Sequence, residues 1–424
     1  MTTREFITSI SRPGHGIKRW IVVLFIGSVV IVFGVLVIDW LSNGNQITTW
    51  LSTAFSRIHE NPNLQSWLLP IIGWASIGAG VLMILYSSAQ VSIAVMRFLA
   101  APHIKHKDPR VPKIVVFGGG SGIFPVLQAL KTLNVEVTAV VTVADSGGST
   151  GKLREEMLIL APGDIRRCMI ALSDQPLFDK LMRYRFSGSG SLDGHSLGNL
   201  MIAAMTMTEG DFTEAVFRMS KMLATKGSVI PFTIDSVSIC AKYEDGSIVQ
   251  GEAEIPKAGK PIKKVFFNPP YAKPYVRVLE AVDEADTIIV GPGSLYTSIM
   301  PCLLLAPIVD TISKSEARKI YISNLMTEPG ETTNYSVEDH LEAIKNHTNC
   351  DLFDTVLVNN GFIDDETLTK YQTKKSKPVP YNPEKIKARV EEADLVEIED
   401  NFVRHSKTKL SRVLSKLIRR SVNA

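Results

Sequence analysis

The sequence predicts an α/β fold with a doubly wound, mostly parallel sheet, preceded by a hairpin of two apolar helices. Three observations lead to this prediction. Two long runs near the N-terminus contain no charged residue, the chain after them alternates short apolar strands with helical patterns, and glycine-rich turns follow several strands. Repeated strand–loop–helix units are typical of a parallel sheet covered on both faces. At 424 residues, the chain has room for the hairpin and one large domain.

The two apolar runs cover residues 20–38 and 67–96. As helices, each would cross about 30 Å of hydrocarbon, so we expect membrane helices at about 20–40 and 67–96, within a hairpin of residues 1–99. A signal peptide is the alternative for the first run, but no small-residue cleavage site closes it and a second run follows. Buried core helices are the alternative for both, although such helices are rarely uncharged all round.

Basic residues at the outer ends of the hairpin predict its orientation. They are Arg4, Arg12, Lys18 and Arg19 before the first helix, and Arg97, Lys105, Lys107 and Arg110 after the second. The connecting loop, at about residues 42–66, has only Arg57. The positive-inside rule therefore predicts a two-span protein of the cell membrane, with both ends and the large domain in the cytoplasm. The membrane is thus an expected partner, through the hairpin.

Residues 100–112 combine prolines and charges without periodicity, which is typical of a linker. We expect the α/β domain at residues 113–404 and a basic C-terminal tail at 405–424. The tail has helical spacing, which fits either a solvated terminal helix or one that binds acidic lipid or a protein. Four widely spaced cysteines form no C-x-x-C pair, which argues against structural zinc and disulfides. A net charge of +3 and the lack of interleaved basic and aromatic residues argue against a nucleic-acid partner.

Within the domain, the elements follow in a regular order. Strands are predicted at residues 113–117 and 135–143 and within 286–294, 318–324 and 354–360, with a β-hairpin at 237–255 that turns at Asp245–Gly246. Helices are predicted at residues 124–133, 163–174, 195–207 and 336–347. Asp164 is a plausible N-cap of the second of these helices, and Ser336 is expected to cap the last. Ligands bind beyond the carboxyl ends of the strands in such sheets, so the chemistry is expected in the loops there.

The first of these loops is a glycine-rich turn between the strand at 113–117 and the next helix. It contains Gly118, Gly119, Gly120, Ser121 and Gly122. Glycine permits close approach of the backbone, and the following helix offers free N–H groups and its positive end to an anion. The pattern matches neither the dinucleotide fingerprint nor the Walker motif, and a tightly packed turn is the alternative.

The second loop is "ADSGGSTGKLRE", which follows the strand at 135–143. Asp145 can hold a divalent cation or a sugar hydroxyl, and Ser146, Gly147, Gly148 and Ser149 can bind phosphate through hydroxyls and main-chain amides. A polar turn is the bland alternative. Mg²⁺, held at Asp145 with a further acid such as Asp164, is the one candidate cofactor, because Mg²⁺ prefers a few carboxylates plus substrate oxygens.

Three further loops supply candidate contacts. They offer Arg166 beside Asp164; His195, Ser196 and Asn199 at a helix start; and Gly293 and Ser294 after a strand. Each has a structural alternative, such as helix capping by Asp164 or Ser196. The catalytic candidates are Asp145, Asp164 and His195, with no reaction assigned. A Ser–His hydrolase is not expected, because His195–Ser196 lies outside any G-x-S-x-G elbow.

Six blocks in order give the chain a family resemblance. They are "VVFGGGSG", "VTVADSGGSTGKLR", "PGDIRRCMIALSD", "GHSLGNL", "GPGSLYTSIMP" and "YISNLMTEPGETTNYSVEDH". Together they closely resemble the gluconeogenesis-factor family, which belongs to the superfamily of 2-phospho-L-lactate transferase. The likeness runs from about Lys113 to about Lys416 and leaves out the N-terminal hairpin. It implies a Rossmann-like α/β fold.

The resemblance also implies a function. The gluconeogenesis-factor branch is similar to a binder of uridine-diphosphate sugars such as UDP-N-acetylglucosamine, linked to cell shape and wall synthesis during growth on gluconeogenic carbon. By the same match, Tyr371 and Arg404 are expected to contact the nucleotide sugar. The alternative is the transferase branch, which uses Mg²⁺ to move a phospholactyl group from a guanylylated donor onto a deazaflavin precursor. Against it, the family often has two consecutive acids where this chain has Asp145–Ser146.

The sequence leaves several properties open. It does not decide which sugar or base is bound, or whether any bond is broken. A protein partner in cell-wall control and a homo-oligomer are both compatible with it.

Overall fold

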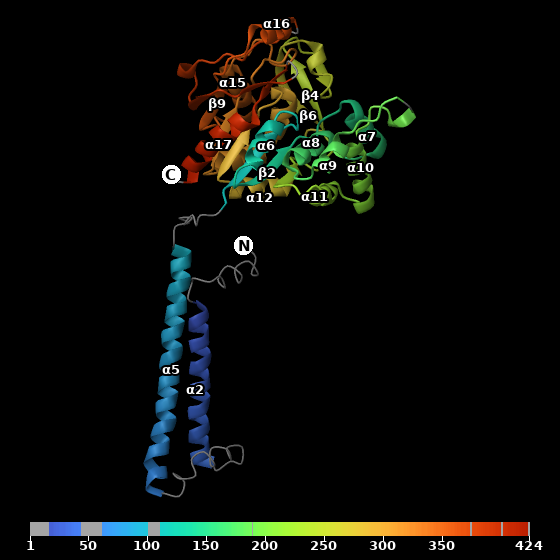
Figure 1. Cartoon of the computed structure of the whole chain (residues 1–424). Coiled ribbons are helices and arrows are strands. Elements are labelled where there is room, and N and C mark those ends of the chain that lie inside the picture. The colour runs from blue at the N-terminus through green and yellow to red at the C-terminus, as the bar shows by residue number, and fades with distance from the viewer. Residues whose placement is uncertain are drawn as a thin grey trace. The chain divides into compact units, whose positions relative to one another are not determined.

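The computed structural model describes residues 17–43, 62–100, 111–188, 190–373, 375–399 and 402–422. The chain forms two compact units, Met1–Lys107 and Asp108–Ala424, shown in Figure 1. The boundary between them falls within the expected linker at 100–112. Residues 101–110 of that linker lie outside the described residues.

The first unit contains two helices, α2 (Ile17–Asn43) and α5 (Pro62–Ala100), which run side by side (Figure 1). Glycines face each other across this contact. A Cβ atom at Gly34 would lie 2.7 Å from the carbonyl oxygen of Gly73, and one at Gly80 would lie 2.7 Å from that of Gly27. Only glycine allows the two backbones to come so close, and small residues of this kind are typical of packed membrane helices.

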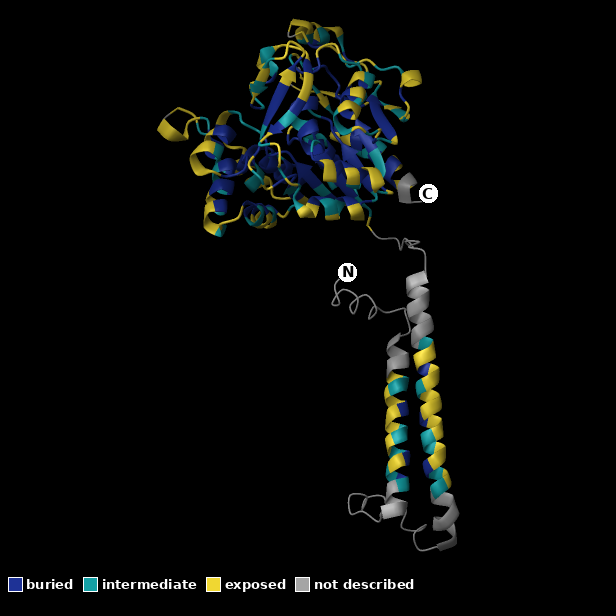
Figure 2. Cartoon of the chain, turned by 180° about the vertical axis from the view of Figure 1, so that it is seen from behind, coloured by how far each residue is buried: buried dark blue, intermediate teal, exposed yellow. Residues whose placement is uncertain are grey.

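One helix of the described residues, Pro70–Gln90, is by itself long and apolar enough to cross a membrane. The apolar part of α2, Val22–Ile38, is shorter. Large apolar residues are exposed on both helices, among them Phe25, Trp74 and Leu82. Figure 2 colours much of the described part of both helices as exposed. The basic flanks at Arg4, Arg12, Arg57, Lys105, Lys107 and Arg110 lie outside the described residues, so the orientation stays a prediction.

The second unit is built on a seven-stranded parallel sheet in the order β10-β9-β8-β7-β1-β2-β3, counted over the described residues. Its strands are β1 (Lys113–Gly118), β2 (Glu136–Val141), β3 (Ser228–Pro231), β7 (Thr287–Val290), β8 (Arg318–Ile322), β9 (Thr355–Asn359) and β10 (Arg389–Ala393). The chain adds strands on one side of β1 first and then on the other, starting with β7. The order therefore reverses between β1 and β7, where sheets of this kind bind their ligands.

Helices cover this sheet, which makes the unit a Rossmann-like α/β domain, as predicted. They are α6 (Phe124–Lys131), α7 (Gly148–Met157), α8 (Pro162–Leu172), α9 (Pro176–Arg183), α10 (Leu197–Glu209), α11 (Phe212–Met222), α12 (Val276–Glu284), α13 (Met300–Leu303), α14 (Ala306–Lys314), α15 (Val337–Thr348), α16 (Asp365–Thr373) and α17 (Lys407–Val422). Helix α6 connects β1 to β2, and α14 lies between β7 and β8, so the two connections run in opposite directions along the sheet. Because both crossovers are right-handed, α6 and α14 lie on opposite faces of the sheet. The strands between them are almost fully buried (Figure 2).

Two smaller sheets complete the domain. The first is antiparallel and contains β4 (Ser238–Tyr243), β5 (Ile248–Gln250) and β6 (Ile262–Asn268). Its β4–β5 turn at Asp245–Gly246 confirms the predicted hairpin, and Gly246 has the positive φ of 85° that such turns require. The second is the hairpin of β11 (Val396–Glu399) and β12 (Phe402–His405).

The C-terminal segment differs from the expected tail at 405–424. It forms α17, whose side chains Leu410, Leu414, Leu417 and Ile418 are buried and which packs on α6. Ser411 lies 2.8 Å from the hydroxyl of Thr132, and Arg318 donates a hydrogen bond to the carbonyl oxygen of Leu417. The helix is therefore part of the domain. Its stripe of apolar side chains is buried against α6, as an amphipathic helix requires.

Candidate functional site

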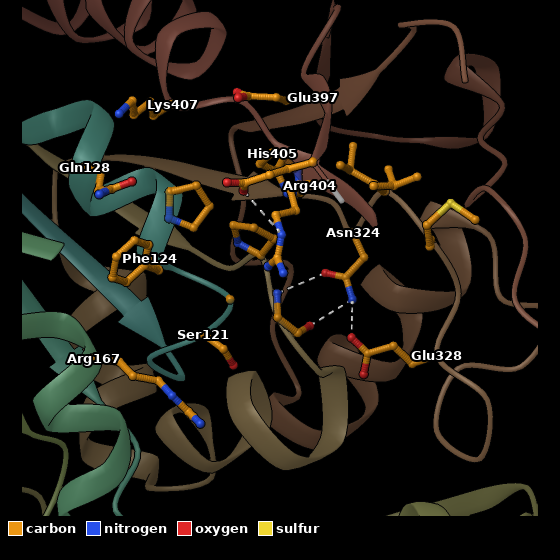
Figure 3. A pocket seen from close by; sticks show the side chains of 18 of the residues that line it. Ser121, Phe124, Gln128, Arg167, Asn324, Glu328, Glu397, Arg404, His405 and Lys407 are labelled. Carbon is orange, nitrogen blue, oxygen red and sulfur yellow. Dashed lines mark hydrogen bonds and ion pairs between the residues drawn. The ribbon is translucent and has the colours of Figure 1, made fainter. Parts of the chain in front are cut away.

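Two adjoining hollows lie at the carboxyl ends of β1, β2, β7 and β8, where the sequence predicted the site. The larger, here called the main groove, has a volume of about 1080 Å³ and is shown in Figure 3. The smaller, here called the side pocket, has a volume of about 330 Å³. Four residues line both hollows: Ser121, Arg166, Arg167 and Arg185. The two hollows therefore share a wall that is rich in arginine.

The glycine turn after β1 packs tightly against its neighbours. A Cβ atom at Gly122 would lie 2.3 Å from the carbonyl oxygen of Pro292, and one at Gly120 would lie 2.5 Å from that of Asp164. Gly119 is similarly close to the side chain of Ser298. Of this turn, Ser121 and Gly122 line the main groove, whereas Gly119 and Gly120 line neither hollow. The glycines are thus needed for packing, which was the structural alternative.

The second glycine turn is the start of helix α7, with Gly147 as its N-cap. The N–H group of Gly147 donates to Oδ1 of Asp145 at 2.8 Å, so this amide is already engaged. Asp145, Gly147, Gly148 and Ser149 line the side pocket. Ser146 does not, because its hydroxyl accepts a hydrogen bond from the backbone of Ala253.

Asp164 is not an N-cap, contrary to our prediction. Helix α8 begins at Pro162 with Ala161 as the N-cap, because proline suits the first helical position, and Asp164 lies in the first turn. Its Oδ1 atom forms an ion pair with Arg167 at 2.9 Å. Burial raises the pKa of Asp164, while Arg167 opposes this shift.

Arginines gather at the wall that the hollows share. Arg166 is buried and donates to the carbonyl oxygen of Met182 at 2.9 Å, and its Nε atom has no partner among the described residues. Desolvation, together with the charges of Arg167, Arg185 and Arg183, lowers the pKa of Arg166 to about 10, while the charge of Asp164 opposes this shift. A buried guanidinium beside three others creates a positive wall that favours an anionic ligand. Sequence reasoning named Arg166 but not Arg183 or Arg185, which no strand-end pattern marks.

The start of helix α10 holds Ser149 in place. Ser196 caps this helix by accepting from the backbone of Asn199, as its structural alternative predicted. The hydroxyl of Ser149 lies 3.1 Å from Nδ1 of His195 and accepts from Nδ2 of Asn199 at 3.2 Å. Neither His195 nor Ser196 lines a hollow, whereas Asn199 lines the side pocket. His195 thus positions Ser149 and does not itself face the side pocket.

Glu252 is a further residue of the side pocket that sequence reasoning missed. It follows β5, in the antiparallel sheet, and its carboxyl group lies near that of Asp145: a Cβ atom at Gly147 would lie 3.5 Å from Oδ1 of Asp145 and 3.9 Å from Oε2 of Glu252. Burial raises the pKa of Glu252 to about 7, and the charges of Asp145 and Asp164 contribute to this shift. In the sequence, Glu252 is an acid near the end of a predicted β-hairpin, and an acid in that position does not by itself indicate a site residue.

This carboxyl pair also bears on the candidate metal. Among the described residues, no group of three or more histidines, cysteines, aspartates and glutamates is arranged to hold an ion. Asp145 and Glu252 could therefore contribute two ligands at most, with the rest supplied by bound phosphate and water. Mg²⁺ is commonly bound in this way, so the donor set fits it, and its binding at Asp145 stays a prediction.

The loop after β7 forms the floor between the two hollows. Gly293 lines the main groove and Ser294 lines the side pocket. Asn324 fixes this loop: its side chain accepts from the N–H group of Gly293 at 3.0 Å and donates to the carbonyl oxygen of the same residue at 2.9 Å (Figure 3). Glu331 fixes the following turn by accepting from the backbone of Tyr296 and the hydroxyl of Thr297.

Tyr371 and Arg404, expected from the family resemblance, both line the main groove. The hydroxyl of Tyr371 accepts from the backbone N–H group of Val403 at 2.9 Å, which ties α16 to β12. Arg404 lies 3.7 Å from Glu399 on the neighbouring strand (Figure 3). The structure thus brings these two residues to one groove with Ser121, although their role as ligand contacts stays a prediction.

Comparisons with known proteins agree with this geometry. The family model described as "2-phospho-L-lactate transferase CofD" matches residues 114–401. A protein from Bacillus subtilis called "Gluconeogenesis factor" is 45% identical over 73% of this chain and 98% of its own length. A "Putative gluconeogenesis factor" from Nostoc is 39% identical over 95% of this chain and 91% of its own, so this relative also covers the hairpin.

The fold is similar to that of a solved structure as well. A crystal structure of a Bacillus halodurans protein superposes with a TM-score of 0.70, at 44% identity, and covers 72% of this chain and 100% of the other. The similarity therefore spans the whole of that protein and leaves out about the part of this chain that forms the hairpin.

Proposed function

Because the chain belongs to the 2-phospho-L-lactate transferase family and to its gluconeogenesis factors, we propose that its α/β domain binds a nucleoside-diphosphate sugar of the UDP-N-acetylglucosamine type. The observation that carries this proposal is the arginine wall. Arg166, Arg167 and Arg185 line both hollows, and Arg183 adds a fourth guanidinium at the main groove.

A diphosphate suits this wall for electrostatic reasons. The guanidinium of Arg166 is largely desolvated and faces like charges, which costs free energy in the absence of an anion. A diphosphate carries compact negative charge and several acceptor oxygens, which match the planar donor set of arginine. Its oxygens would also give Nε of Arg166 the partner that the described residues do not supply.

The main groove suits the nucleoside. Phe124, Pro125 and Met326 give it apolar surface, while Asn324, Tyr371 and Arg404 supply polar groups. Concave sites with apolar walls and a few placed polar groups are typical of small-molecule binding. Its volume of about 1080 Å³ leaves room for a nucleoside and the phosphates.

The hairpin suits a membrane anchor. The long apolar helix Pro70–Gln90, the glycine contacts between α2 and α5, and their outward apolar side chains support this assignment. A membrane-anchored protein that binds a cell-wall precursor could report its supply. We therefore infer a regulatory role in cell shape and wall synthesis during gluconeogenic growth, in keeping with the name of the relatives.

A transferase is the second candidate, and the Asp145–Glu252 pair favours it. A second carboxyl group beside Asp145 compensates for the acid that the sequence lacks at Ser146. With Mg²⁺ bound, such a pair would supply charge stabilisation to phosphoryl-group transfer. In that reaction the arginine wall would hold the phosphates and Ser149 would orient them.

Isothermal titration of the full chain in detergent with UDP-N-acetylglucosamine tests the binding proposal. We expect saturable heat at micromolar to millimolar ligand; no heat at millimolar ligand would refute it. The transferase is tested in parallel by incubating the chain with Mg²⁺, a guanylylated phospholactate donor and a deazaflavin acceptor. Release of GMP would favour the transferase, whereas no GMP together with saturable sugar-nucleotide binding would favour the sensor.

A further inference from the structure

We propose that the side pocket holds the sugar ring of the nucleotide sugar, with Glu252 and Asp145 accepting hydrogen bonds from its hydroxyl or amide groups. This inference rests on the proposed function and adds to it the orientation of the ligand, that is, which part of it lies in which hollow. The nucleoside would occupy the main groove and the diphosphate the arginine wall between the two hollows.

The composition of the two hollows sets this direction. Of the residues that the structure describes, no aromatic or large aliphatic residue lines the side pocket; serines, threonines, glycines, acids, arginines and Asn199 do. A nucleobase needs apolar surface against its faces, and only the main groove offers it, at Phe124 and Met326. A sugar presents hydroxyl donors on all sides, which a polar pocket of about 330 Å³ can accept. The base is thus excluded from the side pocket by chemistry, and the sugar is suited to it.

Asn199 provides an independent observation. This residue is 2% exposed, and its Oδ1 atom has no hydrogen-bond partner among the described residues. Its Nδ2 atom donates to the hydroxyl of Ser149. Turning the amide would let Oδ1 accept from that hydroxyl but would take the partner from Nδ2, so one polar atom of Asn199 stays available to a ligand. A buried acceptor without a donor is costly. A hydroxyl or amide donor from a ligand in the side pocket would satisfy it.

The carboxyl pair adds acceptors on the opposite side. The carboxyl groups of Glu252 and Asp145 lie near each other, beside Gly147, and Oδ1 of Asp145 accepts from the N–H group of Gly147. Among the described residues no hydrogen bond is formed to Oδ2 of Asp145 or to the carboxyl oxygens of Glu252, so these atoms can accept from a ligand. Carboxylates that accept from two neighbouring hydroxyls are a common way to bind a sugar, because charged acceptors form the stronger hydrogen bonds.

The arginine wall links the two halves of the ligand. Arg166, Arg167 and Arg185 face both hollows, so a diphosphate bound there has one end at each. The phosphate next to the sugar would then lie on the side of Ser121 and Ser294, which both line the side pocket. A nucleotide without a sugar would leave the side pocket empty, and this difference allows a test.

The test compares UDP-N-acetylglucosamine with UDP by isothermal titration of the full chain in detergent, with EDTA and with Mg²⁺. We expect Glu252→Ala to weaken binding of UDP-N-acetylglucosamine about tenfold, with or without Mg²⁺. The affinity for UDP should stay within about twofold of that of the unaltered chain. Glu254→Ala is the matched control, because Glu254 is exposed and pairs with Lys257. Glu252→Gln keeps the volume and separates loss of charge from loss of packing, and thermal melting checks that each variant folds.

Three results would overturn the inference. If both ligands lose affinity equally, Glu252 serves the diphosphate. If the loss occurs only with Mg²⁺, the carboxyl pair binds a cation. If neither ligand loses affinity, the sugar lies elsewhere. If the unaltered chain binds neither ligand, the proposed function itself fails, so the two failures are distinguishable.

Discussion

The carboxyl groups of Asp145 and Glu252 lie near each other in the side pocket, although Asp145 follows a strand of the parallel sheet and Glu252 a strand of the antiparallel one. Two neighbouring acids cannot both be charged without a cost in free energy. Burial and this neighbour raise the pKa of Glu252 to about 7, from an ordinary value of 4.5. Stability should therefore depend on pH through this pair.

We predict that Glu252→Gln stabilises the domain at pH 8 but not at pH 4.5. The folded state holds the proton of Glu252 between pH 4.5 and about 7, whereas the unfolded state releases it, so stability falls as pH rises through this window. The variant removes this loss, worth roughly 1 to 2 kcal/mol once partial exposure is allowed for. Melting temperatures measured across this range check it, with Glu254→Gln as the control. An equal difference in melting temperature between Glu252→Gln and the unaltered chain at pH 8 and at pH 4.5 would contradict the prediction.

Arg166→Met is predicted to weaken the binding of UDP and of UDP-N-acetylglucosamine by a similar factor, of about tenfold to a hundredfold. Both ligands carry the diphosphate that the arginine wall would bind, so the variant should not discriminate between them, unlike a change at Glu252. Arg218→Met is the matched control, because Arg218 is on α11 and pairs with Glu209 and Glu214. Titration of the three chains checks this prediction. Unaltered affinity in Arg166→Met would mean that the phosphates bind elsewhere.

Leu414→Ala is predicted to destabilise the domain by about 2 to 4 kcal/mol, because Leu414 is fully buried in the α17 helix that packs on α6. The exposed Arg412→Ala, half a turn away, should change stability by less than about 0.5 kcal/mol. Thermal melting followed by circular dichroism checks both. A harmless Leu414→Ala would indicate a solvated tail, as the sequence alone allowed.

Gly80→Val is predicted to loosen the contact between α2 and α5. A Cβ atom there would lie 2.5 Å from the side chain of Ile31 and 2.7 Å from the carbonyl oxygen of Gly27. Gly78→Val is the matched control, because a Cβ atom at Gly78 meets nothing within 4 Å. All tryptophans of the chain lie before residue 100, so their fluorescence reports on the hairpin alone. We expect the fluorescence transition in detergent to shift to lower temperature in Gly80→Val only; equal shifts would contradict the glycine contact.

Much of the fold could be predicted from the sequence, because strands and their following turns leave local patterns. The ends of parallel strands share one edge of a sheet, so Ser121, Asp145 and Gly293 were expected near one another, and they line two adjoining hollows. The apolar stripe Leu410, Leu414, Leu417 and Ile418 was also visible, but the basic residues around it favoured a tail. Its partner surface on α6 is a tertiary feature that the local pattern does not contain.

The rest of the site could not be predicted, because it depends on tertiary contacts that local sequence patterns do not contain. Glu252 lies near Asp145 only because the antiparallel sheet lies beside the parallel one. Arg183, at the end of α9, reaches the main groove, and Arg185, in the loop after α9, reaches the wall that both hollows share. Local rules also failed at Asp164, where Pro162 moved the helix start back and placed the carboxylate against Arg167. These residues are brought together by topology, not by spacing in the sequence.

A structure of the full chain with bound UDP-N-acetylglucosamine tests the central claim most directly. The account predicts that phosphate oxygens lie within hydrogen-bonding distance of Nε of Arg166, with the uracil in the main groove and the sugar ring beside Glu252. A ligand whose phosphates leave that Nε atom unpaired and lie away from the arginine wall would contradict it.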